Sequence, residues 1–449
     1  MNNVKPRRLS PYWWPLNFIF FLILFPSHSF SLPPTERMSL QNGLRLIVSE
    51  AHSLPFVTFQ LIIDGGSRFD PPNKEGLSYL TAKGLLHGTT KHTSKQMNEL
   101  LDFMGANLHT DSSKDYITVG FKVLKKDLFQ GFHLFMDAIT LPVFPKDEFH
   151  SEIQRTLGII KSVEEDPKEL SEREFFKTLF AGTPYGHPVI GTEESILKLT
   201  RNDLAAFHSS YVRPNRAILV ITGDISLNEI KMDLMSRLEA WPAGNVLPTS
   251  HKQPSAQNTK ILTLERAISQ ANITLGNLAP QRNNPDFFPM IVTNYILGGG
   301  GFSSRLLTEI RAKRGLAYSI RSTFHFKKRV GSFLVSLQTK NDSAQEAISI
   351  VLEEIKKLQK EPVTDIELEG ARKYLTGSFP LQLDTQAKLA GFLAQVEFYG
   401  LGEDYAHNYV SCIMAVTKED VQRVAKKYLN PYNYTLVIVG NLKEGRFRK

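Results

Sequence analysis

Residues 199–225 read LTRNDLAAFHSSYVRPNRAILVITGDI, and residues 416–442 read VTKEDVQRVAKKYLNPYNYTLVIVGNL. The two stretches align without a gap, so matching residues are always 217 positions apart. Each stretch predicts a helix that opens with a Thr-x-x-Asp capping signature, followed by an apolar strand that ends at a glycine. The residues expected at the ends of these elements keep this spacing: Thr200 and Thr417, Asp203 and Asp420, Pro214 and Pro431, and Gly223 and Gly440. A fixed offset at residues that begin and end elements indicates two copies of one domain.

The segments outside the repeat extend this domain. Ahead of the first copy, residues 56–63 and 117–124 predict strands, and two helices are predicted between them, at residues 76–86 and from Thr93 to about residue 104. Strands followed by helices favour an α+β sandwich over a βαβ wind. Residues 242–257 are rich in proline and serine, which is typical of a linker. The predicted chain order is an N-terminal α+β domain at residues 32–241, this linker, and a homologous C-terminal domain at residues 258–449.

Two short signals predict local geometry in the first half. The pair Asn42-Gly43 favours a β-hairpin with a type I′ turn over residues 40–48. Thr93-x-x-Gln96 is a capping box, so a helix is expected to begin after Thr93.

Length and composition describe a globular protein with more than one core. The chain has 449 residues, of which 42% are hydrophobic and 22% are charged. The formal charge of +8 falls to +5 when the first 31 residues are set aside, because these carry three basic residues and no acid. No basic stripe interleaved with aromatic residues accompanies this charge, so no nucleic-acid partner is expected. Cys412 is the only cysteine, which excludes an internal disulfide.

The N-terminus predicts a signal peptide over residues 1–31. Three basic residues precede a mostly apolar run at residues 12–25, and small residues stand at Ser29 and Ser31. The apolar run is shorter than the roughly 20 residues that a membrane span needs. The sequence therefore predicts an exported, periplasmic protein, with an uncleaved N-terminal membrane anchor as the alternative.

A second distinctive stretch is LGGGGFSSRLLTEIRAKRGLAY, residues 297–318. Its glycines permit positive φ angles and the close approach of another chain, and they form a candidate substrate-binding loop at Gly298, Gly299, Gly300 and Gly301. Ser303 or Ser304 is expected to cap a helix that ends near Gly315. Arg311 and Tyr318 then flank the end of that helix. No Gly-Lys-Ser/Thr follows the glycines, so a phosphate-binding P-loop is excluded. A plain loop–helix–turn with surface arginines also fits these residues.

Residues 303–319, SSRLLTEIRAKRGLAYS, resemble the second-half motif of the insulinase/pitrilysin-like zinc peptidases, which include the mitochondrial processing peptidases. In that family an arginine and a tyrosine seven residues apart lie in the domain that faces the zinc. The resemblance assigns these positions to Arg311 and Tyr318. The family also consists of two duplicated α+β halves, which a linker joins into a clam-like chamber. The resemblance therefore implies this fold for nearly all of the mature chain.

The family's zinc signature, H-x-x-E-H, maps onto residues 76–93, GLSYLTAKGLLHGTTKHT, and none of its functional residues is present. The two histidine ligands are replaced by Tyr79 and Lys83, and the catalytic glutamate by Ala82. The third ligand position falls at about Ile159. Because an ammonium group at Lys83 repels a divalent cation, we expect no metal and no cofactor in this chain.

The remaining histidines do not suggest another metal site. His87 and His92 are five residues apart, so they do not share a helical face, and neither has an evident carboxylate partner in the sequence. A structural or surface role is expected for these and the other histidines. No Gly-x-Ser-x-Gly elbow occurs, and Cys412 is isolated, so serine or cysteine catalysis is not expected.

The resemblance implies a zinc-less subunit, as in the heterodimeric bacterial members of the family. The partner subunit would then carry H-x-x-E-H and the zinc, and the substrates would be extended peptides. In that arrangement Tyr318 would hydrogen-bond the developing oxyanion, and Arg311 would hold a substrate carbonyl or carboxylate. Two alternatives stay open at this point. One is a purely structural subunit, like the degenerate members in respiratory complexes, and the other is an autonomous metallopeptidase with an unrecognised metal site.

Overall fold

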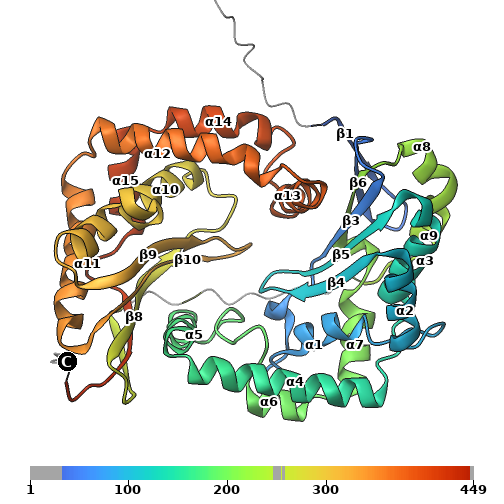
Figure 1. Cartoon of the computed structure of the whole chain (residues 1–449), viewed down its shortest axis with the longest axis horizontal. Coiled ribbons are helices and arrows are strands. Elements are labelled where there is room, and N and C mark those ends of the chain that lie inside the picture. Colours follow the sequence, from blue (N-terminus) through green and yellow to red (C-terminus); the bar gives the residue numbers. More distant parts are fainter. Residues whose placement is uncertain (1–32, 246–253, 255–257, 445–449) are drawn as a thin grey trace, which may run out of the picture. The chain divides into compact units, whose positions relative to one another are not determined.

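The computed structural model describes residues 33–245, 254 and 258–444 (Figure 1). The predicted signal peptide and most of the predicted linker lie outside these residues. Among the helices in the described ranges, none is both long and apolar enough to cross a membrane.

The first sheet has six strands in the order β1-β2-β6-β3-β5-β4. β6 pairs in parallel with β2 and antiparallel with β3. The strands are β1 (Thr35–Ser39), β2 (Arg45–Glu50), β3 (Phe56–Ile63), β4 (Asn107–Ser112), β5 (Ile117–Leu124) and β6 (Ala217–Gly223). One face of this sheet packs against α1 (Leu77–Gly84), α2 (Ser94–Met104), α3 (Leu128–Thr140) and α7 (Arg201–Tyr211). The long helix α4 (Lys146–Glu165) packs against α1. The capping box at Thr93 opens α2, as predicted.

The second sheet repeats the topology of the first. Its order is β7-β11-β8-β10-β9, in which β11 pairs in parallel with β7 and antiparallel with β8. The strands are β7 (Lys260–Glu265), β8 (Gln270–Ala279), β9 (Ala317–His325), β10 (Gly331–Lys340) and β11 (Thr435–Gly440). Its helices include α10 (Phe287–Asn294), α11 (Ala344–Lys360), α12 (Asp365–Ser378), α14 (Tyr405–Ala415) and α15 (Lys418–Tyr428). This order matches β2-β6-β3-β5-β4 strand by strand. The prediction of two homologous α+β halves is therefore confirmed.

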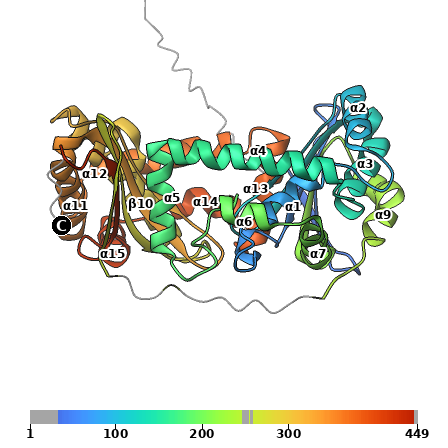
Figure 2. The ribbon, with the colours of Figure 1, turned by 90° about the horizontal axis from the view of Figure 1, so that it is seen from below.

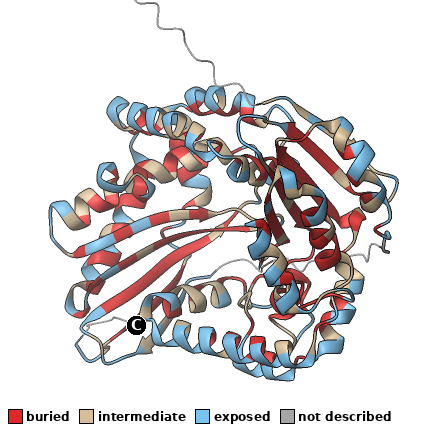
Figure 3. Cartoon of the chain, turned by 45° about the vertical axis from the view of Figure 1, so that its right-hand side comes forward, coloured by how far each residue is buried: buried red, intermediate tan, exposed pale blue. Residues whose placement is uncertain are grey.

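The repeated helix–strand unit occupies the same place in both halves. α7 and α15 both begin after a threonine whose hydroxyl accepts the N–H of the aspartate three residues later, at Thr200 and Thr417. The strand that follows is the fully buried β6 in one half and β11 in the other. Figure 3 shows buried residues concentrated along the strands.

Each half also contributes one helix to the other half's sheet. α5 (Pro167–Leu179) packs on β8 and β11, where Phe175 and Leu179 lie in the same core as Val437. Figure 2 shows α5 beside the second sheet. α13 (Gln386–Tyr399) packs on β3 and β6, where Leu393 lies in the same core as Ile62. Two buried apolar contacts therefore join sequence segments that are far apart. The clam-like chamber implied by the resemblance stays a prediction.

A hairpin around Asn42-Gly43 is present, but its first strand lies ahead of the predicted range of residues 40–48, and its predicted turn type is wrong. β1 and β2 pair antiparallel across a loop at residues 40–44, and Gly43 has φ +85°. A type I′ turn requires positive φ at both central residues, and Asn42 does not adopt it. Its amide instead donates to the carbonyl of Leu238 at 2.7 Å, so a tertiary contact decides the loop conformation.

Candidate functional site

The segment that follows α10 forms a series of tight helical turns instead of one regular loop and α-helix. It comprises a π-helical turn at Tyr295–Gly299, a 3₁₀ turn at Gly301–Ser303 and a π-helix at Leu307–Ala312. The predicted serine cap is absent, because the Ser304 hydroxyl donates to the Gly301 carbonyl at 2.7 Å instead of accepting a backbone N–H. The predicted helix end at Gly315 is confirmed, with φ +63° and an N–H that donates to the Arg311 carbonyl.

The glycine run serves mainly close packing within the chain. A Cβ atom at Gly298 would lie 2.6 Å from the Ser322 hydroxyl on β9, and Cβ atoms at Gly299 and Gly300 would also clash with their own turn. Only Gly301 of the four has a positive φ, at +56°, with open space beside it. The run thus lets this turn press against β9. Its role as a substrate-binding loop stays a prediction.

Arg311 lies close to two exposed aromatic rings. Its guanidinium carbon is 4.6 Å from the centre of the Tyr318 ring and 5.1 Å from that of the Phe302 ring. Tyr318 is 79% exposed, on the outermost strand β9, and Phe302 is 77% exposed. These two cation–π contacts orient the guanidinium, and its N–H groups have no hydrogen-bond partner among the described residues. The structure therefore brings together the two residues that the sequence singled out, and adds Phe302, which sequence reasoning missed.

The hydrogen-bonding groups of this pair are unused, in contrast to those of the neighbouring cations. Arg305 forms a two-pronged ion pair with Glu367, at 2.6 and 3.0 Å. Lys313 and Arg314 both bind Glu309. Within the described residues, neither the Arg311 side chain nor the Tyr318 hydroxyl has a hydrogen-bond or ion-pair partner. The pair is thus free to bind a ligand.

The positions that hold zinc in the resembled family are filled by groups unsuited to a metal. On α1, the Lys83 ammonium donates to the Thr110 carbonyl at 3.0 Å and lies 5.3 Å from the centre of the Tyr79 ring. Ala82 is fully buried, and Ile159 on α4 is 39% exposed. The side chains present at these positions do not fit zinc. In the ranges that the structure describes, no group of three or more histidine, cysteine, aspartate or glutamate side chains could hold a metal ion.

The expectation that His87 lacks a carboxylate partner is wrong. Its Nε2 lies 3.5 Å from a carboxylate oxygen of Glu152, which is 3% exposed on α4 and also pairs with Arg155. Burial acts to raise the pKa of Glu152, but the hydrogen bond from His87 and the charges of Arg155 and Lys83 outweigh it and lower the pKa. One feature of the sequence could have indicated this pair: Glu152 lies on the buried face of α4, together with Ile153, Thr156 and Ile160. A buried glutamate needs a partner.

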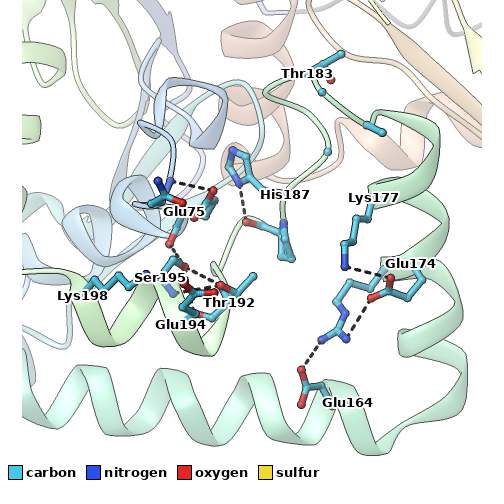
Figure 4. A pocket seen from close by; sticks show the side chains of 16 residues that line it. Glu75, Glu164, Glu174, Lys177, Thr183, His187, Thr192, Glu194, Ser195 and Lys198 are labelled. Atoms are coloured by element: carbon cyan, nitrogen blue, oxygen red, sulfur yellow. Dashed lines mark hydrogen bonds and ion pairs between the residues drawn. The ribbon is translucent and has the colours of Figure 1, made fainter. Parts of the chain in front are cut away.

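A cavity of about 570 Å³ lies elsewhere, between α5, the loop that follows it and α6 (Glu193–Lys198) (Figure 4). Its charged side chains largely neutralise one another. Arg173 pairs with Glu164 and Glu174, and Lys198 pairs with Glu194. Burial lowers the pKa of His187 in its wall to about 4, so this imidazole is neutral at physiological pH. Within the described residues, the Glu75 carboxylate accepts only the Asn73 N–H, at 3.2 Å, and has no ion-pair partner, and the buried Nε2 of His187 has no hydrogen-bond partner.

Comparisons with known proteins agree with this fold along most of the chain. Residues 45–193 match insulinase (peptidase family M16), and residues 198–375 match the peptidase M16 inactive domain. An uncharacterized zinc protease of Streptomyces coelicolor is 26% identical over 91% of this chain and 90% of its own length. A protein named as a non-peptidase homolog in Helicobacter pylori is 25% identical, over 90% of this chain and 94% of its own length.

Solved structures lead to the same conclusion. The crystal structure of a peptidase M16 inactive domain from Pseudomonas fluorescens has a TM-score of 0.85 and 26% identity, and it covers 90% of this chain and 98% of that one. A protease from Helicobacter pylori has the same TM-score of 0.85 at 21% identity, over 91% of this chain and 100% of that one, which shows the fold. The predicted family is confirmed by both kinds of match: this chain belongs to the insulinase-like peptidase family M16.

Proposed function

We propose that this chain is a non-zinc-binding subunit of an M16 peptidase and completes the active site of a homologous partner subunit that carries H-x-x-E-H. The observation that carries the proposal is the contrast between two sites. Tyr318 is exposed, Arg311 is half-buried, and both are unpaired within the described residues, whereas Tyr79 and Lys83 stand where zinc ligands would be. The names of the relatives, an inactive domain and a non-peptidase homolog, support a subunit that does not bind zinc itself.

Each of the two residues has one chemical role in peptide hydrolysis. The zinc of the partner would polarise the scissile carbonyl and activate water. The Tyr318 hydroxyl donates a hydrogen bond to the oxygen on which negative charge develops. The guanidinium edge of Arg311 donates to a carbonyl or carboxylate of the substrate. Because β9 is the outermost strand, an extended peptide can lie along it beside Tyr318.

Export completes the proposal. Removal of the first 31 residues would release the chain into the periplasm, and retention of that segment would leave it anchored to the membrane. Mass spectrometry of protein from the native host distinguishes the two, since only cleavage removes the N-terminal basic and apolar run.

A purely structural subunit is the second candidate. Replacement of the zinc positions fits that role equally well, but a scaffold has no chemical need for an unpaired arginine held beside a free phenol.

The test is reconstitution with an H-x-x-E-H homologue encoded in the same genome. We expect the two chains to co-purify and only the mixture to cleave an unstructured peptide. Cleavage by this chain alone, or by the partner alone at the rate of the mixture, refutes the proposal.

A further inference from the structure

The outer face of α12 carries an apolar stripe that the described chain leaves uncovered. Ile366 is 87% exposed and Tyr374 is 58% exposed, and each lies four residues from the exposed Gly370. Gly377 and Leu381 continue the stripe, the latter in the 3₁₀ turn that follows the helix, and both are exposed. The opposite face of α12 is buried in the core of the second half. These five residues, here called the α12 stripe, are apolar where a solvent-facing helix carries polar side chains.

The two glycines of the α12 stripe have no packing role within the described chain. Glycine destabilises the interior of a helix relative to alanine, so its presence there calls for a reason. A Cβ atom at Gly370 or Gly377 would meet no atom within 4 Å, whereas one at Gly298 would meet Ser322. The glycines of the stripe therefore leave room for a surface that comes from outside this chain.

The order of large and small residues along the stripe fits a second copy of itself. An antiparallel pair of α12 helices that crosses near Arg372 places Tyr374 of one copy opposite Gly370 of the other, to within one residue. The same crossing places Ile366 opposite Gly377. Each large apolar side chain then fills the space beside a glycine, as in the packing of helix ridges into grooves.

The charges beside the stripe follow the same symmetry. Glu369 and Lys373 lie on one flank of the stripe, with carboxylate and ammonium 3.2 Å apart, and both are exposed. In an antiparallel pair this flank of one copy meets the same flank of the other, so Glu369 faces Lys373 twice in each dimer. A parallel pair would instead place like charges opposite each other, which is unfavourable. The charges thus favour the arrangement that also matches large residues with glycines.

Tyr374 is already oriented for such packing. The centre of its ring lies 4.9 Å from the centre of the Tyr295 ring. A side chain that is held in place before association loses less conformational entropy when the partner binds.

We propose that the α12 stripe is the interface at which two copies of this chain form a symmetric dimer. The proposed peptidase function uses none of these residues, so the two proposals stand independently. One helix pair buries less surface than a standard interface, and we expect a weak dimer with a dissociation constant on the order of 10 µM. Stability measured on dilute, monomeric protein is therefore independent of the stripe.

Sedimentation velocity of the purified protein between about 1 and 100 µM tests the proposal, and the wild type should pass from monomer to dimer over this range. Gly370→Leu fills the groove but raises helix propensity, so this variant should fold and stay monomeric. Gly158→Leu is the matched control. Gly158 is also an exposed glycine inside a helix, α4, with no atom within 4 Å of an added Cβ, and this variant should dimerise like the wild type.

A charge exchange tests the antiparallel register. Glu369→Lys and Lys373→Glu each turn both ion pairs of the dimer into contacts between like charges, so each variant alone should dimerise at least about 10-fold more weakly. An equal mixture of the two variants should dimerise as tightly as the wild type, because every contact again joins opposite charges. Both side chains are exposed, so neither substitution should affect folding.

A wild-type protein that stays monomeric at about 100 µM overturns the proposal. So does a dimer that Gly370→Leu leaves intact, or a mixture of the charge variants that dimerises as weakly as each variant alone. If Gly370→Leu abolishes pairing with the H-x-x-E-H homologue and the wild type alone is monomeric, the stripe binds that homologue, and the symmetric dimer is again overturned. Loss of the dimer alone leaves the reconstituted peptidase activity, and with it the test of the proposed function, unchanged.

Discussion

Replacement of Asp115 by asparagine should destabilise the protein strongly, because this carboxylate joins the two halves. It is 1% exposed and follows β4 in the first half. One oxygen accepts from Arg68 at 2.9 Å and from the Tyr185 hydroxyl at 2.6 Å. The other accepts the backbone N–H of Lys328 at 2.9 Å, in the turn between β9 and β10.

The expected size follows from these contacts. Asparagine keeps the shape but can accept on one oxygen only, so at least one hydrogen bond is lost in either amide orientation. The Arg68 guanidinium, whose side chain is 1% exposed, also loses one of its two carboxylate partners but keeps its ion pair with Asp64. Breaking a buried ion pair on one side costs about 3–5 kcal/mol, and because Asp64 still pairs with Arg68 we expect Asp115→Asn to lower the free energy of unfolding by about 3 kcal/mol, the lower end of that range.

Urea unfolding followed by tryptophan fluorescence measures this change. Asp111→Asn is the matched control, since Asp111 is exposed on β4 and its side chain has no partner among the described residues. The control should shift stability by less than about 0.5 kcal/mol. A shift equally small for Asp115→Asn would show that this junction does not hold the halves together.

Three further predictions follow from single contacts. Gly298→Ala should lower the free energy of unfolding by about 1–3 kcal/mol, because the added Cβ would lie 2.6 Å from the Ser322 hydroxyl. Gly370→Ala on α12 is the control and should not destabilise the protein, because no atom lies within 4 Å of its added Cβ. Equal melting temperatures of the two variants would refute the packing role of Gly298. Burial acts to raise the pKa of Asp286, but hydrogen bonds from Tyr428, Arg423 and Lys427 outweigh it and lower the pKa to about 2. The stability that Asp286 contributes is therefore present above pH about 4 and is lost as the pH falls through 2. In Asp286→Asn the free energy of unfolding should therefore fall less steeply between pH 4 and pH 2 than in the wild type. Identical dependence on pH in the two proteins would contradict this. The purified chain should bind no stoichiometric zinc, and elemental analysis that finds one tightly held metal per chain would overturn this expectation.

The repeat was predictable because its signals are local. Capping threonines, an apolar strand and a closing glycine recur at one spacing, and each acts within a few residues of itself. The spacing of Arg311 and Tyr318 likewise spans one short helix and the start of the next strand, so their proximity follows from nearby chain geometry.

What the sequence did not reveal depends on contacts between distant segments. Nothing near Phe175 indicates that α5 packs on the second sheet, because its partners Leu334 and Val437 follow far along the chain. The same holds for the pairing of His87 with Glu152 and for the conformation of Asn42. The alignment of Gln338 with Asn272 depends on strand register, which only the assembled sheet defines.

The most direct test of the proposed function is Tyr318→Phe in the reconstituted complex at saturating partner. The variant removes one exposed hydroxyl, so folding and pairing should be nearly unchanged. Peptidase activity should fall by about 10²–10³-fold if the hydroxyl stabilises the oxyanion. Activity equal to that of the wild-type complex would contradict the proposal and leave the structural role standing.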